Sequence, residues 1–233
     1  MNKIERLEWD STFFGYEVGR IISEDNSIDF NNFVVDSNKY KLIYIFSKAP
    51  LENSLFNLVD KKTIFNQKIE PNISDYKSSV KIEQYKSEKH EFEQLKSLAF
   101  QSGIYSRFFK DKQFIDNEFQ RLYTRWIEMS VNDSKNYTVL IAFYNEKVAG
   151  FITLKYISNK KSEIGLIAVS QDYRGLGIGK SLINEAIQKS IENGIEEINI
   201  TTQLDNQIAV NLYKSTNFNI QEITYIYHWW NSN

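Results

Sequence analysis

The chain has 233 residues and is 42% hydrophobic, which is ample for one large domain or two small ones. Its 28 basic and 30 acidic side chains leave a formal charge of −2, so no global basic field recruits nucleic acid or an anionic membrane. The absence of cysteine excludes disulfides, thiolate metal sites and a cysteine nucleophile. The two histidines, His90 and His228, lie far apart in the sequence, so we expect no metal site.

The N-terminal residues are charged and lack the apolar core of a signal peptide. No apolar run approaches the length of a membrane span. The expectation is a soluble, cytoplasmic protein without a nucleic-acid or membrane partner.

Residues 1–78 are predicted to form a small α/β domain. IERLEW and YEVGRII alternate as strands do, DFNNFVVDSNKY suits a short helix, and KLIYIF suits a buried strand. The stretch NQKIEPNISDYKSS carries turn and breaker residues. It is therefore the expected boundary with a second domain, residues 79–233.

The second domain is predicted to be α/β as well. Apolar residues at helical spacing indicate helices in 87–100 and 117–131. The later elements are expected in this order: strands YTVLIAFY, VAGFITLKYI and SEIGLIAV, a helix from Lys180 to Asn193, a strand EEINITT, a short helix DNQIAVNLYKS and a final strand FNIQEITYIYHWW. Asn145–Lys147 is expected to connect a hairpin, and Gly194 to end the long helix in a left-handed cap.

A glycine cluster, VSQDYRGLGIGKSLI, lies between the third of these strands and the long helix. Alternating glycines tolerate positive φ and can direct several backbone amides toward one anion. The N-terminus of the following helix adds its dipole, and Arg174 and Lys180 add charge. The spacing fits neither a P-loop nor GxGxxG. These residues alone leave two interpretations open, an anion site and a plain strand-to-helix turn.

The arrangement RxxGxG, from Arg174 to Gly179, resembles motif A of the GNAT acyltransferases. A second match is N-x-x-A-x-x-L-Y, from Asn206 to Tyr213, and the resemblance covers roughly residues 80 to 230. It implies the GNAT fold, a mixed and mostly antiparallel central sheet flanked by helices. It also implies acetyl-CoA as cosubstrate, with its pyrophosphate on the loop amides.

The same resemblance implies roles for individual residues. Tyr213 is the implied general acid that protonates the departing CoA sulfur. It lies about two helical turns from Asn206, so both side chains share one helix face. The residues implied to bind acetyl-CoA are Ile167, Ala168, Val169, Arg174, Gly175, Leu176, Gly177, Ile178, Gly179, Lys180 and Asn206. The alternative for Tyr213 is an aromatic that only seals the helix against the sheet.

The general base is not defined by the sequence. Glu163 precedes the strand implied to bind acetyl-CoA, but a solvated carboxylate at a strand end explains it equally well. Water is enough if the acceptor amine has a pKa near neutrality.

The acceptor must be inferred from other segments. WDSTFFG, SRF followed by FQRLYTRWIEMSV, and YIYHWW are similar to the TDP-fucosamine acetyltransferases and their relatives within the family. This resemblance implies transfer to the 4-amino group of a dTDP-linked 4-amino-4,6-dideoxyhexose, for bacterial surface polysaccharide synthesis. Tyr105 and Arg107 are the candidate acceptor-binding residues, because a pyrophosphate and a base favour a cation and aromatic surface. The alternative is an interhelical loop with core aromatics and a solvated arginine.

Other functions stay open. The acceptor could be a peptide N-terminus, a polyamine or an antibiotic, and the chain could be a non-catalytic acyl-CoA-binding module. His90 is expected to be solvent-exposed. His228 is expected to pack in the terminal strand, with a place in the sugar pocket as the alternative, and this aromatic strand is compatible with a homodimer contact.

Overall fold

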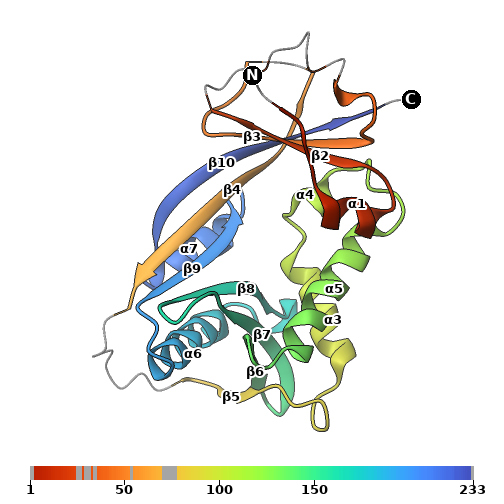
Figure 1. Cartoon of the computed structure of the whole chain (residues 1–233). Coiled ribbons are helices and arrows are strands. Elements are labelled where there is room, and N and C mark those ends of the chain that lie inside the picture. The colour runs from red at the N-terminus through yellow and green to blue at the C-terminus, as the bar shows by residue number, and fades with distance from the viewer. Residues whose placement is uncertain are drawn as a thin grey trace.

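The computed structural model describes residues 3–24, 28, 33, 36–52, 55–69 and 78–231. They form a ten-stranded sheet in the order β1-β2-β3-β10-β4-β9-β8-β7-β6-β5 (Figure 1). The strands are β1 (Glu5–Arg6), β2 (Val18–Ser23), β3 (Leu42–Ser47), β4 (Asn57–Lys68), β5 (Lys81–Gln84), β6 (Tyr137–Tyr144), β7 (Lys147–Tyr156), β8 (Lys161–Val169), β9 (Glu197–Gln203) and β10 (Asn219–Trp230). The helices are α1 (Glu8–Phe14), α3 (Phe92–Ser102), α4 (Arg107–Lys110), α5 (Glu118–Asn132), α6 (Ile178–Glu192) and α7 (Gln207–Ser215), with a 3-10 turn η1 (Gln171–Tyr173).

Two long strands, β4 and β10, connect the N-terminal strands to the rest of the sheet (Figure 1). Strand β10 pairs antiparallel with β3 on one side and with β4 on the other. Strand β4 in turn pairs antiparallel with β9. Strands from before and after residue 78 are therefore direct neighbours in the sheet. The division into domains at residue 78 stays a prediction, and it does not coincide with a break between sheets. Residues 70–77 of the expected boundary segment lie outside the described residues.

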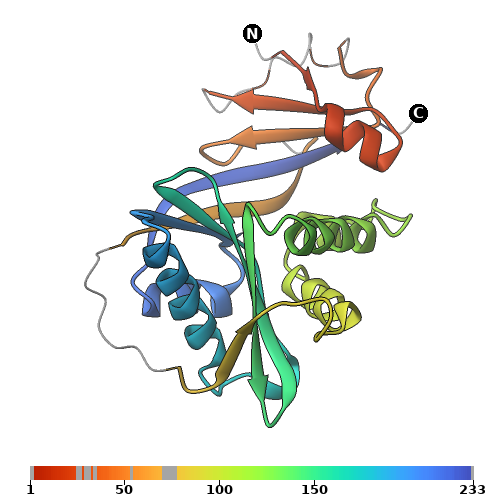
Figure 2. The same cartoon turned by 60° about the horizontal axis from the view of Figure 1, so that its bottom comes forward.

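Helices cover the two faces of the sheet separately (Figure 2). On one face α6 and α7 bury apolar side chains that include Leu182, Ile183 and Val210. On the opposite face α3 and α5 bury a second set that includes Leu95 and Leu122. The apolar stripes predicted for these helices are the buried faces, because tertiary packing stabilises an amphipathic helix mainly through this face.

Turn chemistry accounts for the connections near the site. Asn145 and Glu146 have positive φ of 47° and 62°, which gives the β6–β7 hairpin the twist that its strands need. Gly194 has φ of +71° directly after α6, as predicted for a left-handed cap. Helix α6 begins earlier than expected, at Ile178, because Gly177 with φ of +76° occupies its N-cap.

Several sequence predictions were wrong. IERLEW forms a strand only at Glu5–Arg6, since the next residues start α1, which Gly15 ends with φ of +82°. The segment IYSRFF is not a loop throughout, because Arg107–Lys110 forms α4. The helix expected in DFNNFVVDSNKY is not among these errors, since Phe33, Asp36 and Ser37 are helical and residues 29–32, 34 and 35 lie outside the described residues. The His90 side chain is only 6% exposed, since it packs between Tyr85 and Phe143 and accepts a hydrogen bond from the Lys86 amide.

Candidate active site

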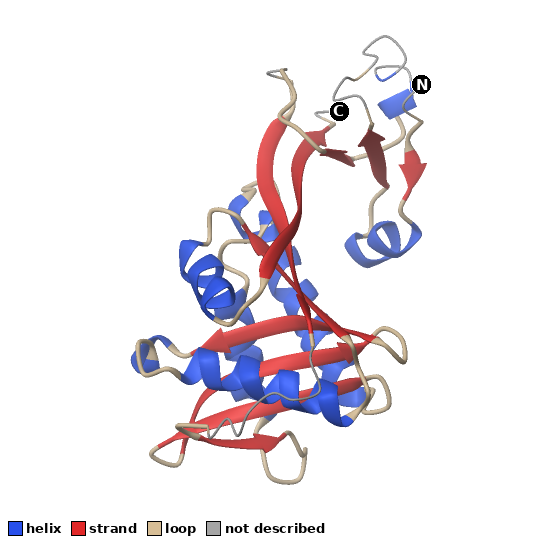
Figure 3. Ribbon diagram, turned by 90° about the vertical axis from the view of Figure 1, so that its left-hand side faces the viewer, coloured by secondary structure: helices blue, strands red, loops and turns tan. Residues whose placement is uncertain are grey.

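The central opening of the fold lies where β8 and β9 separate. Their parallel ladder runs only from Lys161–Glu197 to Ile164–Ile200. A bulge follows at once in β8, where Gly165 and Leu166 together oppose Thr153 of β7, and the Leu166 amide donates to Thr153 Oγ1 at 2.8 Å. Figure 3 shows the strands from the side. Beyond the bulge, the edge of β8 that turns away from β7 faces a cavity instead of another strand.

The glycine loop closes one end of this cavity. Gly175 and Gly177 have φ of +82° and +76°, and an added Cβ on Gly179 would come within 3.0 Å of Leu212. Gly177 is the N-cap residue of α6 and has no side chain that could accept from the helix. The first amides of this helix are therefore free to point at a ligand. Arg174 lies beside them and donates from Nε to the Val169 carbonyl at 3.3 Å. Positive φ, close packing and unpaired amides are the features that suit a turn to binding an anion.

The cavity has a volume of about 470 Å³ and contains most of the predicted cosubstrate residues. Those that line it are Ile167, Ala168, Val169, Arg174, Gly175, Gly177, Ile178, Gly179, Lys180 and Asn206. Leu176 does not line it, because its side chain is 45% exposed on the outside of the loop. The other wall consists of the end of β9 and the facing side chains of α3 and α5, with Tyr123, Thr202 and Gln203 among them. An elongated ligand with an anionic end and a polar arm fits this lining.

Tyr213 enters the cavity from α7. Its side chain is 3% exposed and its ring meets Phe65 edge-on at 5.5 Å. Burial raises the pKa of Tyr213, so the phenol keeps its proton at neutral pH. The tyrosine thus seals the helix against the sheet and still presents a protonated hydroxyl to the cavity. Asn206 caps the same helix, since its Oδ1 accepts from the Ala209 amide at 3.3 Å.

The two candidate acceptor residues have different positions. Tyr105 lines the cavity, whereas Arg107 does not. Its guanidinium lies 4.9 Å from the Tyr44 ring centre and 4.4 Å from that of Phe108, and its charge acts on the carboxylates of Asp10 and Asp60. Arg107 is therefore neither a solvated arginine nor a free cation, because two carboxylates already face it.

His228 is buried, as expected for a residue that packs in the terminal strand. Its Nδ1 lies 2.6 Å from Asp111 Oδ2, to which Trp230 Nε1 also donates at 2.8 Å. Burial lowers the pKa of His228 to about 4 despite the Asp111 partner, so the ring is neutral near pH 7. Burial acts to raise the pKa of Asp111, but the bonds donated by His228 and Trp230 outweigh it and the pKa falls. This network ties the last strand to the residues after α4.

Glu163, the candidate base, does not line the cavity. It lies in the part of β8 that still pairs with both neighbours, opposite Lys155 and Asn199. Asp60, a buried carboxylate on β4 that lies near the cavity residue Gln203, was not identified from the sequence. A single aspartate in an otherwise mixed strand gives no local signal of this environment.

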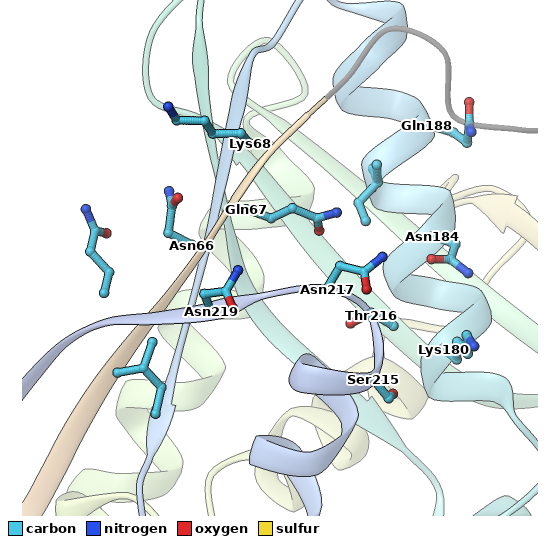
Figure 4. Close-up of a pocket in the computed structure, with 13 residues that line it drawn as sticks. Asn66, Gln67, Lys68, Lys180, Asn184, Gln188, Ser215, Thr216, Asn217 and Asn219 are labelled. Carbon is cyan, nitrogen blue, oxygen red and sulfur yellow. The ribbon is translucent and has the colours of Figure 1, made fainter.

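A larger groove of about 810 Å³ lies between α6, β4 and the turn that joins α7 to β10 (Figure 4). Carboxamides line it from β4, α6 and the start of β10: Asn66, Gln67, Asn184, Gln188, Asn217, Asn219 and Gln221. It shares Lys180 with the glycine-loop cavity. Ser215, Thr216 and Lys68 also line this polar groove. Among the described residues, no group of three or more His, Cys, Asp or Glu side chains could hold a metal ion.

The model of the acetyltransferase (GNAT) family matches residues 98–218, which include the opened strand, the glycine loop and α7. The chain belongs to this family. The fold agrees, with a mixed central sheet flanked by helices and opened between β8 and β9.

Relatives share parts of the chain. It is 31% identical over 78 residues to mycothiol acetyltransferase of Corynebacterium aurimucosum, which covers 32% of this chain and 26% of the relative. It is 42% identical over 55 residues to N-alpha-acetyltransferase 30 of Saccharomyces cerevisiae, covering 24% and 31%. The chain thus spans only about a quarter to a third of the length of these curated relatives.

A solved structure extends the likeness to the N-terminal strands. A conserved protein of unknown function from Staphylococcus epidermidis aligns with a TM-score of 0.64 at 13% identity, covering 93% of this chain and 84% of that one. At this identity the likeness concerns the fold alone. Within the described part of the chain, no helix has the length and apolarity needed to cross a membrane.

Proposed function

We propose that the protein is an acetyl-CoA-dependent N-acetyltransferase. The observation that carries the proposal is the separation of β8 from β9, with free loop amides at one end of the cavity and the Tyr213 hydroxyl inside it. The amides and Lys180 suit the pyrophosphate, and the unpaired edge of β8 suits the amide groups of the pantetheine arm. Acetyl-CoA supplies a thioester that an amine can attack directly.

Different residues of the cavity have different roles in this transfer. Backbone amides of Ile167–Val169 can hydrogen-bond the thioester oxygen and stabilise the negative charge that develops there. Tyr213 holds a proton that the departing sulfur needs, and its raised pKa keeps it in the donating form. The apolar surroundings of Tyr213, which include Phe65, exclude water from this end of the cavity.

The proposed acceptor is the 4-amino group of a dTDP-linked 4-amino-4,6-dideoxyhexose. The support is the similarity of WDSTFFG, SRF and YIYHWW to the nucleotide-sugar branch of the family. Two of these segments pack together, because Phe14 of α1 lies against Phe108 of α4 near the Tyr105 end of the cavity. Tyr105 then contributes an aromatic surface for the nucleotide, and Arg107 acts as a positioning residue between Asp10 and Asp60.

A peptide N-terminus is the second candidate acceptor. The observation that favours it is the identity of 42% over 55 residues to a relative named as an N-alpha-acetyltransferase. Since the match is confined to a quarter of this chain, it speaks for the donor site more than for the acceptor.

The test is a panel of acceptors with acetyl-CoA, followed by release of free thiol. The panel contains dTDP and UDP 4-amino sugars, the same sugars acetylated in advance, short peptides with free N-termini, and spermidine. We expect turnover of the dTDP amino sugar and none of its acetylated form. Turnover of peptides alone would replace the sugar acceptor by the second candidate, and calorimetry that finds no acetyl-CoA binding would overturn the enzyme itself.

A further inference from the structure

Asp60 is a buried carboxylate that no structural need of the fold explains. It lies on β4 opposite Ile226 of β10, and 7% of it is exposed. Its Oδ1 is shielded from solvent and makes no hydrogen bond in the described structure. A buried oxygen of this kind is costly to the fold, because it loses its hydration without a replacement.

The groups around Asp60 come from every neighbouring element. Arg107 and Lys110 face it from α4, Lys62 lies on its own strand, and Gln203 of β9 lies close enough to lower its pKa. Tyr123 of α5 lies close enough for its pKa to respond to Asp60. Burial raises the pKa of Asp60 to about 6, although Arg107, Gln203 and the lysines act in the opposite direction. The carboxyl is therefore ionised near pH 7 and holds a proton at slightly lower pH.

Nearby cations do not neutralise Asp60 through contact. Lys61 and Lys110 approach Asp205 instead, at 3.5 Å and 4.0 Å. No salt bridge among the described residues includes Asp60, and the Arg107 side chain is held by the rings of Tyr44 and Phe108. One carboxylate oxygen of Asp60 thus has neither an ion-pair nor a hydrogen-bond partner among the described residues.

Asp60 lines one cavity and lies near residues that line another. Asp60 lines a pocket of about 290 Å³ between β4 and α4, together with Lys110 and Asp205. Gln203, which pairs with Lys62 two residues further along β4, lines the cavity that contains Tyr213 and the glycine loop. Tyr123, whose pKa responds to Asp60, lines the same donor cavity, so the Asp60 carboxylate lies near its acceptor end.

We propose that Asp60 receives the ammonium group of the acceptor and takes its proton as the amine attacks the donor, a role that rests on the proposed N-acetyltransferase function. The acceptor class is a primary amine that is protonated in solution. In the step, the ammonium nitrogen first passes one proton to the Asp60 carboxylate, which releases it to solvent, and the free amine then forms a bond to the thioester carbon. The nitrogen of this intermediate passes a second proton to Asp60, the carbon–sulfur bond breaks, and the sulfur takes the Tyr213 proton. The proton on Asp60 then returns to Tyr213 through solvent, so the step is balanced.

The kinetic test compares Asp60→Asn, Asp60→Glu and the control Glu163→Gln, which lies outside the cavity. Asp60→Asn is expected to lower kcat at pH 7 by about a hundredfold or more and to leave acetyl-CoA binding by calorimetry unchanged. The rate of the parent protein should level off above about pH 6, whereas the rate of Asp60→Asn should keep rising toward the pKa of the amine. Asp60→Glu should recover part of the loss, and Glu163→Gln should match the parent. A folded Asp60→Asn protein with the parental rate and pH profile overturns the proposal.

A second readout uses the unmodified protein. The Asp60 carboxyl, followed by carbon NMR, should titrate near pH 6, and its pKa should fall when an acceptor amine binds without acetyl-CoA. A signal that does not respond to the bound amine overturns the proposal, even if Asp60→Asn fails to fold.

Failure of the proposed acceptor can be distinguished from failure of the role proposed for Asp60. If no nucleotide sugar is acetylated, the sugar acceptor is wrong, and the pH profiles are recorded with whichever amine of the panel is turned over. Asp60 is then judged on that amine, independently of the sugar.

Discussion

At the scale of single residues, a substitution at Tyr213 can distinguish a catalytic role of its hydroxyl from a purely structural role of its ring. Tyr213→Phe removes only the hydroxyl and keeps the ring against Phe65. We expect kcat to fall by about a hundredfold, with an unchanged KM for acetyl-CoA and nearly unchanged stability, because proton donation to the sulfur is lost. The check is steady-state kinetics together with denaturant unfolding. Unchanged turnover in a folded variant would leave Tyr213 as a packing residue only.

Asp60 allows a prediction on stability that is independent of any acceptor. Burial is the main cause of its raised pKa, so the folded protein holds the Asp60 proton more tightly than the unfolded chain. The free energy of unfolding therefore falls as pH rises from about 4 through about 6, and the loss persists at neutral pH. A shift from 3.8 to about 6 corresponds to about 3 kcal/mol.

Asp60→Asn should accordingly stabilise the fold at pH 7 by up to about 3 kcal/mol, and by less than about 1 kcal/mol near pH 4. Urea unfolding at both pH values measures this difference. Asp205→Asn is the control, since it removes an exposed carboxylate and should change stability little at either pH. A pH-independent effect of Asp60→Asn would show that burial of the ionised Asp60 carboxylate does not destabilise the fold.

The residues that could be predicted from the sequence are those whose role depends on local spacing. The glycines and Tyr213 lie in short motifs, so their positions in the cavity follow from a turn and one helix. Asp60 and the environment of Arg107 depend on the pairing of β4 with β9 and on α4 lying across them. No pattern within either segment records these long-range contacts, which is why Arg107 was expected at a pyrophosphate and is found between carboxylates.

At the scale of elements, the glycine loop and α6 provide a matched pair of substitutions. Gly177 and Gly194 lie just outside opposite ends of α6 with φ of +76° and +71°, and each has room for a methyl group. Alanine at either position should destabilise the protein by about 1 kcal/mol, because the left-handed region is unfavourable for it. Only Gly177→Ala disturbs the amides that start α6, so it alone should weaken acetyl-CoA binding, by about tenfold. Equal effects of both variants on calorimetric binding would argue against an anion site at the loop.

The remaining elements show which helices and strands can be predicted from the sequence pattern alone. The strands from β6 to β10 and the helices α3, α5 and α6 follow alternation or helical spacing closely, and their order could be predicted. Helices α1 and α4 were missed because they have only 7 and 4 residues, too short for a periodic stripe. The rings of Phe14 in α1 and Phe108 in α4 lie 6.1 Å apart, a long-range contact that neither segment shows by itself.

At the scale of the whole molecule, the pairing of strands in the sheet indicates that the regions before and after residue 78 fold together. The N-terminal region contributes β4, which occupies the place between β9 and β10, and β3, which covers the other edge of β10. The pairing partners could not be predicted, because alternation identifies a strand but not its neighbours.

A fragment of residues 79–233 would contain the family motifs yet lack both partners of β10 and one partner of β9. Three unpaired strand edges in the middle of a sheet expose backbone groups and promote aggregation. We therefore expect this fragment to be insoluble or to unfold without cooperativity, and co-expression of residues 1–78 as a separate chain to restore acetyl-CoA binding. Circular dichroism, denaturant unfolding and calorimetry compare the fragment, the co-expressed pair and the intact chain. A fragment that unfolds cooperatively and binds acetyl-CoA alone would establish residues 79–233 as an independent domain, with β4 as an added strand that its core does not require.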